Sequence, residues 1–90
     1  MQKTISIKVS GIVQGVYYRQ STKAKAVEIG VSGEVKNDPD GTVTIVATGT
    51  DDQLKSFIKW CQKGPETAVV GDLKIDEIDF KEFTDFKIRR

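Results

Sequence analysis

Apolar and polar residues alternate along several short stretches of the chain, with the period of two that half-buried β-strands show. In residues 3–9, Ile5, Ile7 and Val9 fall on one face and polar side chains on the other. Two further stretches flank the turn sequence Asn37-Asp-Pro-Asp-Gly41, an arrangement that predicts a hairpin. The expected strands span residues 3–9, 31–36, 42–48, 70–75 and 86–90, and the fourth of them has an irregular phase.

A wider spacing of the apolar positions predicts a helix between the first two strands. Tyr18, Thr22, Ala26 and Ile29 recur at helical intervals, and Gly30 follows as a natural stop. Tyr18 begins the apolar face of this helix, so we expect its ring to lie in the core.

The second predicted helix carries explicit signals at both ends. Thr50 suits the N-cap position, and Gln53 completes a capping box with it. The sequence Lys63-Gly-Pro65 is typical of a helix end. The apolar stripe of this helix consists of Leu54, Phe57, Ile58 and Cys61. Its pattern predicts that the Cys61 thiol is buried and inert. Trp60 lies off the stripe and is expected to be partly exposed.

The element order is therefore β-α-β-β-α-β with a short extra C-terminal strand. This order is typical of an α+β fold, a ferredoxin-like two-layer sandwich with two helices on one face of a mostly antiparallel sheet. The length of 90 residues suits a single domain, residues 1–90.

Composition excludes several classes of function. Fourteen basic residues against thirteen acidic ones give a net charge of +1, so a strongly basic nucleic-acid binder is not expected. No apolar run reaches the ~18–20 residues of a membrane span, and no signal peptide is visible, so we expect a cytoplasmic protein without a membrane partner. The chain has no His and one Cys, which removes His-based triads, a His general base, His metal sites and intrachain disulfides.

The glycine-containing stretch between the first strand and the first helix is a candidate anion site. In Gly11-Ile-Val-Gln-Gly-Val-Tyr-Tyr-Arg19, glycines let backbone N–H groups converge, and the helix N-terminus adds unpaired donors. Arg19 falls in the first turn of that helix, and residues 1–30 hold five basic residues and one acidic residue, a local balance of +4. The alternative is an ordinary βα turn with a solvated arginine. The turn residue Asn37 has an equally ordinary alternative, since hairpin turns favour Asn.

Together these two stretches resemble the acylphosphatase family. Val9-Ser-Gly-Ile-Val-Gln-Gly-Val-Tyr-Tyr-Arg19 is similar to its signature V-x-G-x-V-Q-G-V-x-[FY]-R. Gly33-Glu-Val-Lys-Asn-Asp-Pro-Asp-Gly-Thr-Val43, continuing to Gly49, is similar to its second signature, and Phe86-Lys-Ile-Arg89 to its closing F-x-I-R. The resemblance covers essentially the whole chain.

The resemblance implies an acylphosphate phosphohydrolase, which cleaves the carboxyl–phosphate bond of acyl phosphates to a carboxylate and inorganic phosphate. The catalytic positions of the family fall on Arg19, which holds the phosphoryl group, and on Asn37, which orients the attacking water. Thr42 falls where the family has a hydroxyl that steadies this asparagine. The substrate-binding backbone amides fall on Gln14, Gly15, Val16, Tyr17 and Tyr18.

The resemblance also implies the partners of the protein. We expect a small acyl phosphate as substrate, inorganic phosphate as product and inhibitor, no cofactor, no metal and a monomer. The chain departs from the second signature at Glu34, where the family usually has an aromatic residue. This departure is expected to affect the site rim, the substrate preference or a surface contact, and it leaves both catalytic positions intact.

Other functions stay open at this point. The first is a non-catalytic ferredoxin-like module that binds an anion or metabolite, which turnover of an acyl phosphate would exclude. The second is an acylphosphatase-like domain detached from a larger hydrogenase-maturation protein. An RNA-binding module is disfavoured because strands 3–9 and 42–48 carry no aromatic residue.

Overall fold

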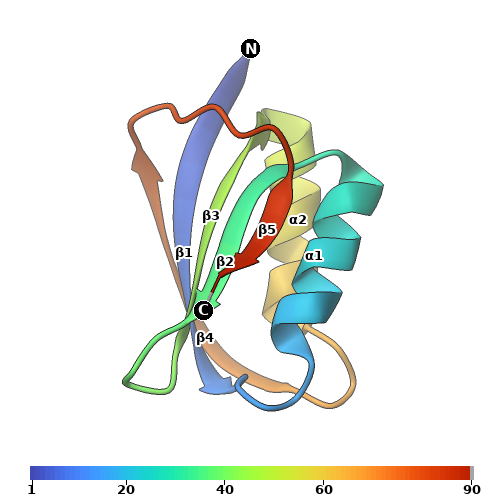
Figure 1. Ribbon diagram of the computed structural model, residues 1–90, viewed down its shortest axis with the longest axis vertical. Coiled ribbons are helices and arrows are strands. Elements are labelled where there is room, and N and C mark those ends of the chain that lie inside the picture. The colour runs from blue at the N-terminus through green and yellow to red at the C-terminus, as the bar shows by residue number, and fades with distance from the viewer. Residues whose placement is uncertain (90) are drawn as a thin grey trace.

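Two helices cover one face of a five-stranded sheet in the computed structural model, which describes residues 1–89 (Figure 1). The strand order is β4-β1-β3-β2-β5, and every neighbouring pair is antiparallel except β2 and β5. The predicted ferredoxin-like α+β fold is confirmed. The elements are β1 (Gln2–Ile12), α1 (Tyr18–Ile29), β2 (Ser32–Asn37), β3 (Val43–Thr50), α2 (Asp51–Lys63), β4 (Val69–Ile78) and β5 (Phe86–Arg89); Arg90 of the predicted last strand lies outside the described residues.

The helix ends follow the local signals in the sequence. The α1 helix ends at Gly30, which has a φ of 96° and donates its N–H to the Ala26 carbonyl. Such a left-handed conformation suits glycine. The α2 helix begins with the predicted capping box, in which the Gln53 N–H donates to the Thr50 hydroxyl at 3.2 Å and the Thr50 N–H donates to the Gln53 side chain at 2.9 Å.

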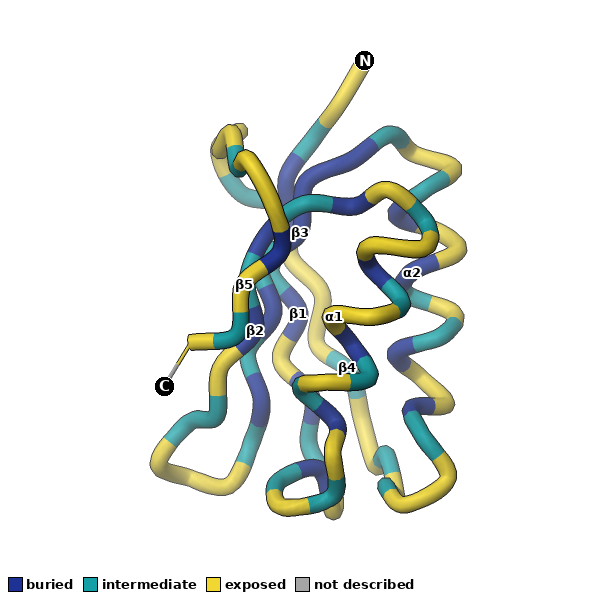
Figure 2. Tube along the Cα trace, turned by 45° about the vertical axis from the view of Figure 1, so that its right-hand side comes forward, coloured by how far each residue is buried: buried dark blue, intermediate teal, exposed yellow. Residues whose placement is uncertain are grey.

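The core lies between the helices and the inner face of the sheet (Figure 2). Tyr18 joins the two helices, because its ring is buried and its hydroxyl donates to the Cys61 carbonyl at 2.9 Å. Burial raises the pKa of the Tyr18 phenol and raises that of the Cys61 thiol to about 12. Apolar side chains without any exposed surface come from both helices and from the three central strands: Ile7, Val9, Ala26, Val35, Val43, Ile45, Ala47, Phe57 and Cys61.

Two strands differ from the sequence-based expectation. β1 continues to Ile12 through an irregular step at Ser10 and Gly11, because these residues pair with the start of β4. The loop expected between the strand of residues 3–9 and the helix that begins near Tyr18 therefore shortens to residues 13–17. β4 forms an edge of the sheet and is exposed or half-buried along its whole length, which explains its irregular apolar phase.

A glycine in β2 lets the last strand dock against the sheet. Gly33 has a φ of 146°, and a Cβ atom at this position would lie 1.9 Å from the Val46 carbonyl oxygen. Its N–H donates to the Asp85 carbonyl at 2.9 Å, just before β5 begins. Glycine at position 33 therefore permits the close approach of β3, β2 and β5.

Three segments meet at one end of the molecule. The loop after β1, the turn between β2 and β3 and the end of β5 all lie opposite the N-terminus (Figure 1). Neither of the two helices within residues 1–89 is long and apolar enough to cross a membrane.

Candidate active site

The loop of residues 13–17 connects a central strand directly to the first helix. Its backbone is left-handed at Gly15, with a φ of 73°, and at Tyr17, with a φ of 62°. A Cβ atom at Gly15 would meet nothing within 4 Å, so glycine is favoured there by conformation and not by space. A non-glycine residue in this region costs ~1–2 kcal/mol, and strain of this kind concentrates at functional sites.

The N-terminus of α1 is open, whereas that of α2 is closed. No backbone carbonyl among residues 1–89 accepts a hydrogen bond from the N–H groups of residues 14–20. The first turn of α1 has no acidic residue and no side-chain cap, whereas α2 has its capping box and two aspartates, Asp51 and Asp52. The loop therefore presents unpaired donors at the positive end of a helix dipole, an arrangement that suits an anion.

A cavity of about 810 Å³ opens in front of these donors. It brings together five residues that the sequence singled out: Gly15, Tyr17, Tyr18, Arg19 and Asn37. Gln14, Val16 and Thr42, which the sequence also predicts for the site, do not line this cavity. Its other lining residues are Val13, Gln20 and Ile88; Gln20 could have been expected from its place beside Arg19, whereas Ile88 carries no chemical signal.

Arg19 is held between the first helix and the last strand. It is the second residue of α1 and is half-buried, and its Nη1 donates to the Arg89 carbonyl at 3.3 Å. A guanidinium has five N–H donors in a planar fork. The remaining donors are available to an oxyanion in the cavity, and the contact with β5 restricts where they point.

Asn37 is the last residue of β2 and also lines the cavity. Its side-chain oxygen Oδ1 is buried and has no hydrogen-bond partner among residues 1–89. A buried acceptor left unpaired costs ~1–3 kcal/mol. Such atoms are rare in native proteins, and this one belongs to a residue that lines the cavity.

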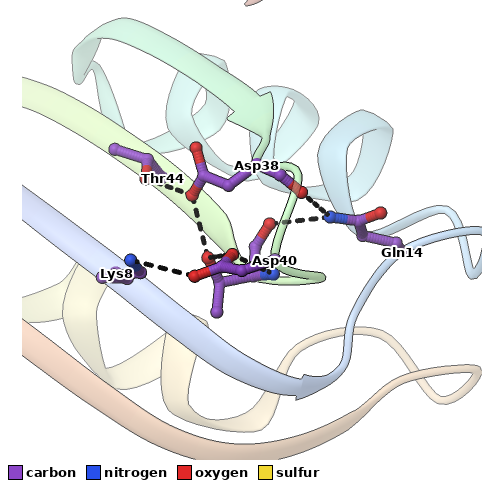
Figure 3. A network of polar contacts seen from close by, with 6 residues as sticks. Lys8, Gln14, Asp38, Asp40 and Thr44 are labelled. Carbon is purple, nitrogen blue, oxygen red and sulfur yellow. Dashed lines mark hydrogen bonds and ion pairs between the residues drawn. The ribbon is translucent and has the colours of Figure 1, made fainter.

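The turn that follows Asn37 is fixed by a polar network (Figure 3). The Thr42 hydroxyl lies 2.9 Å from Asp38 Oδ2 and 2.6 Å from Asp40 Oδ1, and Lys8 Nζ lies 3.2 Å from Asp40 Oδ2. Hydrogen bonds from Thr42 and the contact with Lys8 lower the pKa of Asp40 to about 2. The Thr42 hydroxyl thus contacts the carboxylates of the turn, and Asn37 Oδ1 accepts no hydrogen bond from it.

Two residues that the sequence singled out, Gln14 and Glu34, do not line the cavity but contact neighbouring segments. The side-chain amide of Gln14 reaches the turn between β2 and β3 (Figure 3). Glu34 on β2 forms an ion pair with Arg89 on β5, with Oε1 3.3 Å from Nε. The departure from the second signature at Glu34 thus makes a surface contact, and this contact joins β2 to the strand that receives the hydrogen bond of Arg19.

Carboxylates near the site are engaged within the turn. Asp38 and Asp40 share the Thr42 hydroxyl, and Asp38 also accepts from the Thr44 hydroxyl. Residues 1–89 contain no group of three or more His, Cys, Asp or Glu side chains placed to hold a metal ion.

Known proteins match the part of the chain that contains all the residues lining the cavity. The family model named Acylphosphatase matches residues 5–88. An acylphosphatase of Marinobacter nauticus is 55% identical over 80 residues, which is 88% of this chain and 87% of that protein. The structure of an acylphosphatase from Coxiella burnetii is 38% identical with a TM-score of 0.94, covering 98% of this chain and 93% of its own. The crystal structure of Bacillus subtilis acylphosphatase is 32% identical, also with a TM-score of 0.94, and covers 100% of both chains.

Proposed function

The chain belongs to the acylphosphatase family and hydrolyses the carboxyl–phosphate bond of acyl phosphates, and we propose that it binds the phosphoryl group on the 13–17 loop and orients the attacking water with Asn37. The observation that carries this proposal is the buried Oδ1 of Asn37, which has no partner among residues 1–89 and belongs to a residue that lines the same cavity as Arg19 and the first residue of α1.

The phosphoryl group is proposed to bind to Arg19 and to the backbone N–H groups from Gln14 to Tyr18. No backbone carbonyl among residues 1–89 accepts from these N–H groups, and the helix dipole favours a negative charge there. Arg19 supplies a charge-assisted, bidentate contact. These donors surround the place where charge develops on the equatorial oxygens, so they stabilise the transition state in particular.

Asn37 is proposed to accept a hydrogen bond from the water that attacks phosphorus. The water oxygen forms the new bond to phosphorus, and the bond from phosphorus to the acyl oxygen breaks with its electron pair leaving on the carboxylate. The proton of the water passes to a phosphate oxygen of the substrate, so no side chain acts as a general base. A carboxylate leaving group needs little protonation, so placement of the water and of the phosphoryl group suffices.

Inorganic phosphate is the second product and, in this proposal, an inhibitor that occupies the same donors. The monomeric state and the cytoplasmic location stay predictions from the sequence. Sedimentation of the purified chain at enzymatic concentrations would test the first of these, and a dimer would contradict it.

The proposal is tested by incubating the purified chain with benzoyl phosphate in excess chelator and following loss of the acyl phosphate. We expect turnover, competitive inhibition by inorganic phosphate, and thermal stabilisation by phosphate, because a ligand that binds only the folded state stabilises it. In the Arg19→Ala variant this stabilisation should largely disappear, whereas Lys23→Ala, an exposed cation on the same helix, should retain it. Equal phosphate stabilisation of both variants would contradict the proposed site.

A further inference from the structure

We propose that Gln14 is a positioning residue whose side-chain amide fixes the phosphate-binding loop against the turn that follows Asn37; the proposal rests on the function proposed above. Gln14 Nε2 lies 2.8 Å from the Asp38 carbonyl oxygen and 2.8 Å from the Thr42 carbonyl oxygen (Figure 3). Both partners can only accept, so the amide nitrogen donates both of its hydrogens. These two bonds join segments that lie 24 and 28 residues apart in the sequence.

The two carbonyl groups that Gln14 contacts are the ones that close the turn. The Asp38 N–H donates to the Thr42 carbonyl at 2.8 Å, and the Gly41 N–H donates to the Asp38 carbonyl at 3.1 Å. Each carbonyl oxygen therefore accepts two hydrogen bonds, one from the turn and one from Gln14, which matches its two lone pairs. Gln14 can make both of its bonds only when the turn is closed.

The position of Asn37 Oδ1 depends on this turn. Asn37 pairs with Val43 at the end of the hairpin and directly precedes Asp38. Its Oδ1 has no partner among the described residues, so the backbone on either side places this atom. Because Gln14 holds that backbone to the loop, the water site and the phosphoryl site keep a constant separation.

The side-chain amide of Gln14 contacts the turn, whereas its backbone N–H is assigned to the anion site. Both hydrogens of the side-chain amide point to the turn, and the side chain does not line the cavity. The backbone N–H donates to no backbone carbonyl among residues 1–89 and belongs to the proposed anion site. Loss of the side-chain amide should therefore change the alignment of the reacting groups and leave the affinity for phosphate unchanged. Misplacement by ~1 Å can cost ~10²-fold in rate.

The first test is the Gln14→Met variant, which keeps the side-chain length and removes both donors. Each carbonyl retains its bond within the turn, so the fold is expected to persist. We expect kcat to fall ~10–100-fold with an unchanged inhibition constant for inorganic phosphate. The matched control is Gln53→Met, which removes the side-chain partner of the α2 capping box and should lower the resistance to urea while leaving kcat unchanged.

The decisive measurement is a double-mutant cycle with Asn37→Ala. If Gln14 acts by positioning Asn37, then Gln14→Met should cost little further in kcat once the Asn37 amide is gone. Losses that multiply would overturn the proposal, and so would a Gln14→Met variant whose phosphate inhibition weakens as much as its kcat/KM. If the Met variant does not fold, Gln14→Asn, which keeps the amide and is one methylene shorter, enters the same cycle.

The result also separates this proposal from the function on which it rests. If the unmodified chain fails to hydrolyse benzoyl phosphate, or if Asn37→Ala retains full activity, the proposed catalytic roles are wrong. If the unmodified chain is active and Asn37→Ala is not, multiplicative losses in the cycle contradict only the role of Gln14.

Discussion

Replacing Asn37 by alanine should separate stability from activity. The side-chain oxygen of Asn37 is buried without a partner among residues 1–89, and an unsatisfied acceptor costs the folded state ~1–3 kcal/mol. Asn37→Ala removes this acceptor together with part of the side-chain packing. We therefore expect the free energy of unfolding to stay unchanged or to rise by up to ~1 kcal/mol.

The same substitution should abolish most of the turnover. Removal of one preorganised polar group from an active site typically costs ~10²–10³ in kcat, or ~2.7–4 kcal/mol of transition-state stabilisation. Inhibition by inorganic phosphate should not change, because Asn37 is assigned to the water and Arg19 to the phosphate. Urea unfolding measures the first quantity, and steady-state kinetics with benzoyl phosphate measure the other two.

A matched control lies at the other end of the same strand. Ser32 is half-buried and donates its hydroxyl to the Thr48 carbonyl at 3.5 Å, so Ser32→Ala should cost a little stability and leave kcat intact. A normal kcat in Asn37→Ala would refute the role of Asn37 in catalysis. A loss of more than ~1 kcal/mol of stability in this variant would also refute it and make Asn37 a structural turn residue.

Three further predictions follow from the site. Arg19→Ala should lower kcat/KM by ~10²–10³-fold and weaken phosphate inhibition in steady-state assays; normal values of both would exclude Arg19. kcat should stay flat between about pH 6 and 8 for a substrate in one charge state, because no guanidinium, amide or backbone group titrates there and the chain has no His; a bell-shaped profile with the same two pKa values for two different acyl phosphates would contradict this. The pKa of Asp40 is lowered to about 2, so its ionised carboxylate stabilises the folded state above the usual pKa of a carboxyl group, and this contribution is lost as the pH falls toward 2. Between about pH 5 and 2, the free energy of unfolding should therefore fall less steeply in Asp40→Asn than in the unmodified chain. Equal slopes for the two proteins would contradict the lowered pKa.

The elements that the sequence predicted well are those fixed by neighbouring residues. The capping box of Thr50 and Gln53 and the stop at Gly30 form hydrogen bonds with backbone groups only a few residues away. Such local signals can be recognised in the sequence without knowledge of the fold. The alternation in β1 and β3 reports burial on one face. Edge strand β4 has no fully buried residue, and its apolar positions therefore carried too weak a pattern to fix its bounds.

The residues of the candidate site also divide into those that the sequence pointed to and those that only the folded structure brings together. Resemblance to a family pointed to Arg19 and Asn37, and the structure brings both to one cavity. No spacing rule connects Gln14 to a turn more than twenty residues away, because the contact arises only when β1 pairs with β3. The pairing of Glu34 with Arg89 likewise depends on the docking of β5 beside β2. Contacts of this kind depend on tertiary structure.

Because Cys61 is buried, the reactivity of its thiol can measure how often the folded chain opens transiently. The thiol is the only one in the sequence, has no exposed surface, and has a pKa raised to about 12. Because only the thiolate is reactive, an alkylating reagent at neutral pH can modify Cys61 only when α2 separates from the sheet. The rate of alkylation would then follow the population of opened molecules, without any introduced label. Added phosphate should slow this alkylation, since a ligand at the N-terminus of α1 stabilises the closed form, in which Tyr18 at that same end bonds to the Cys61 carbonyl.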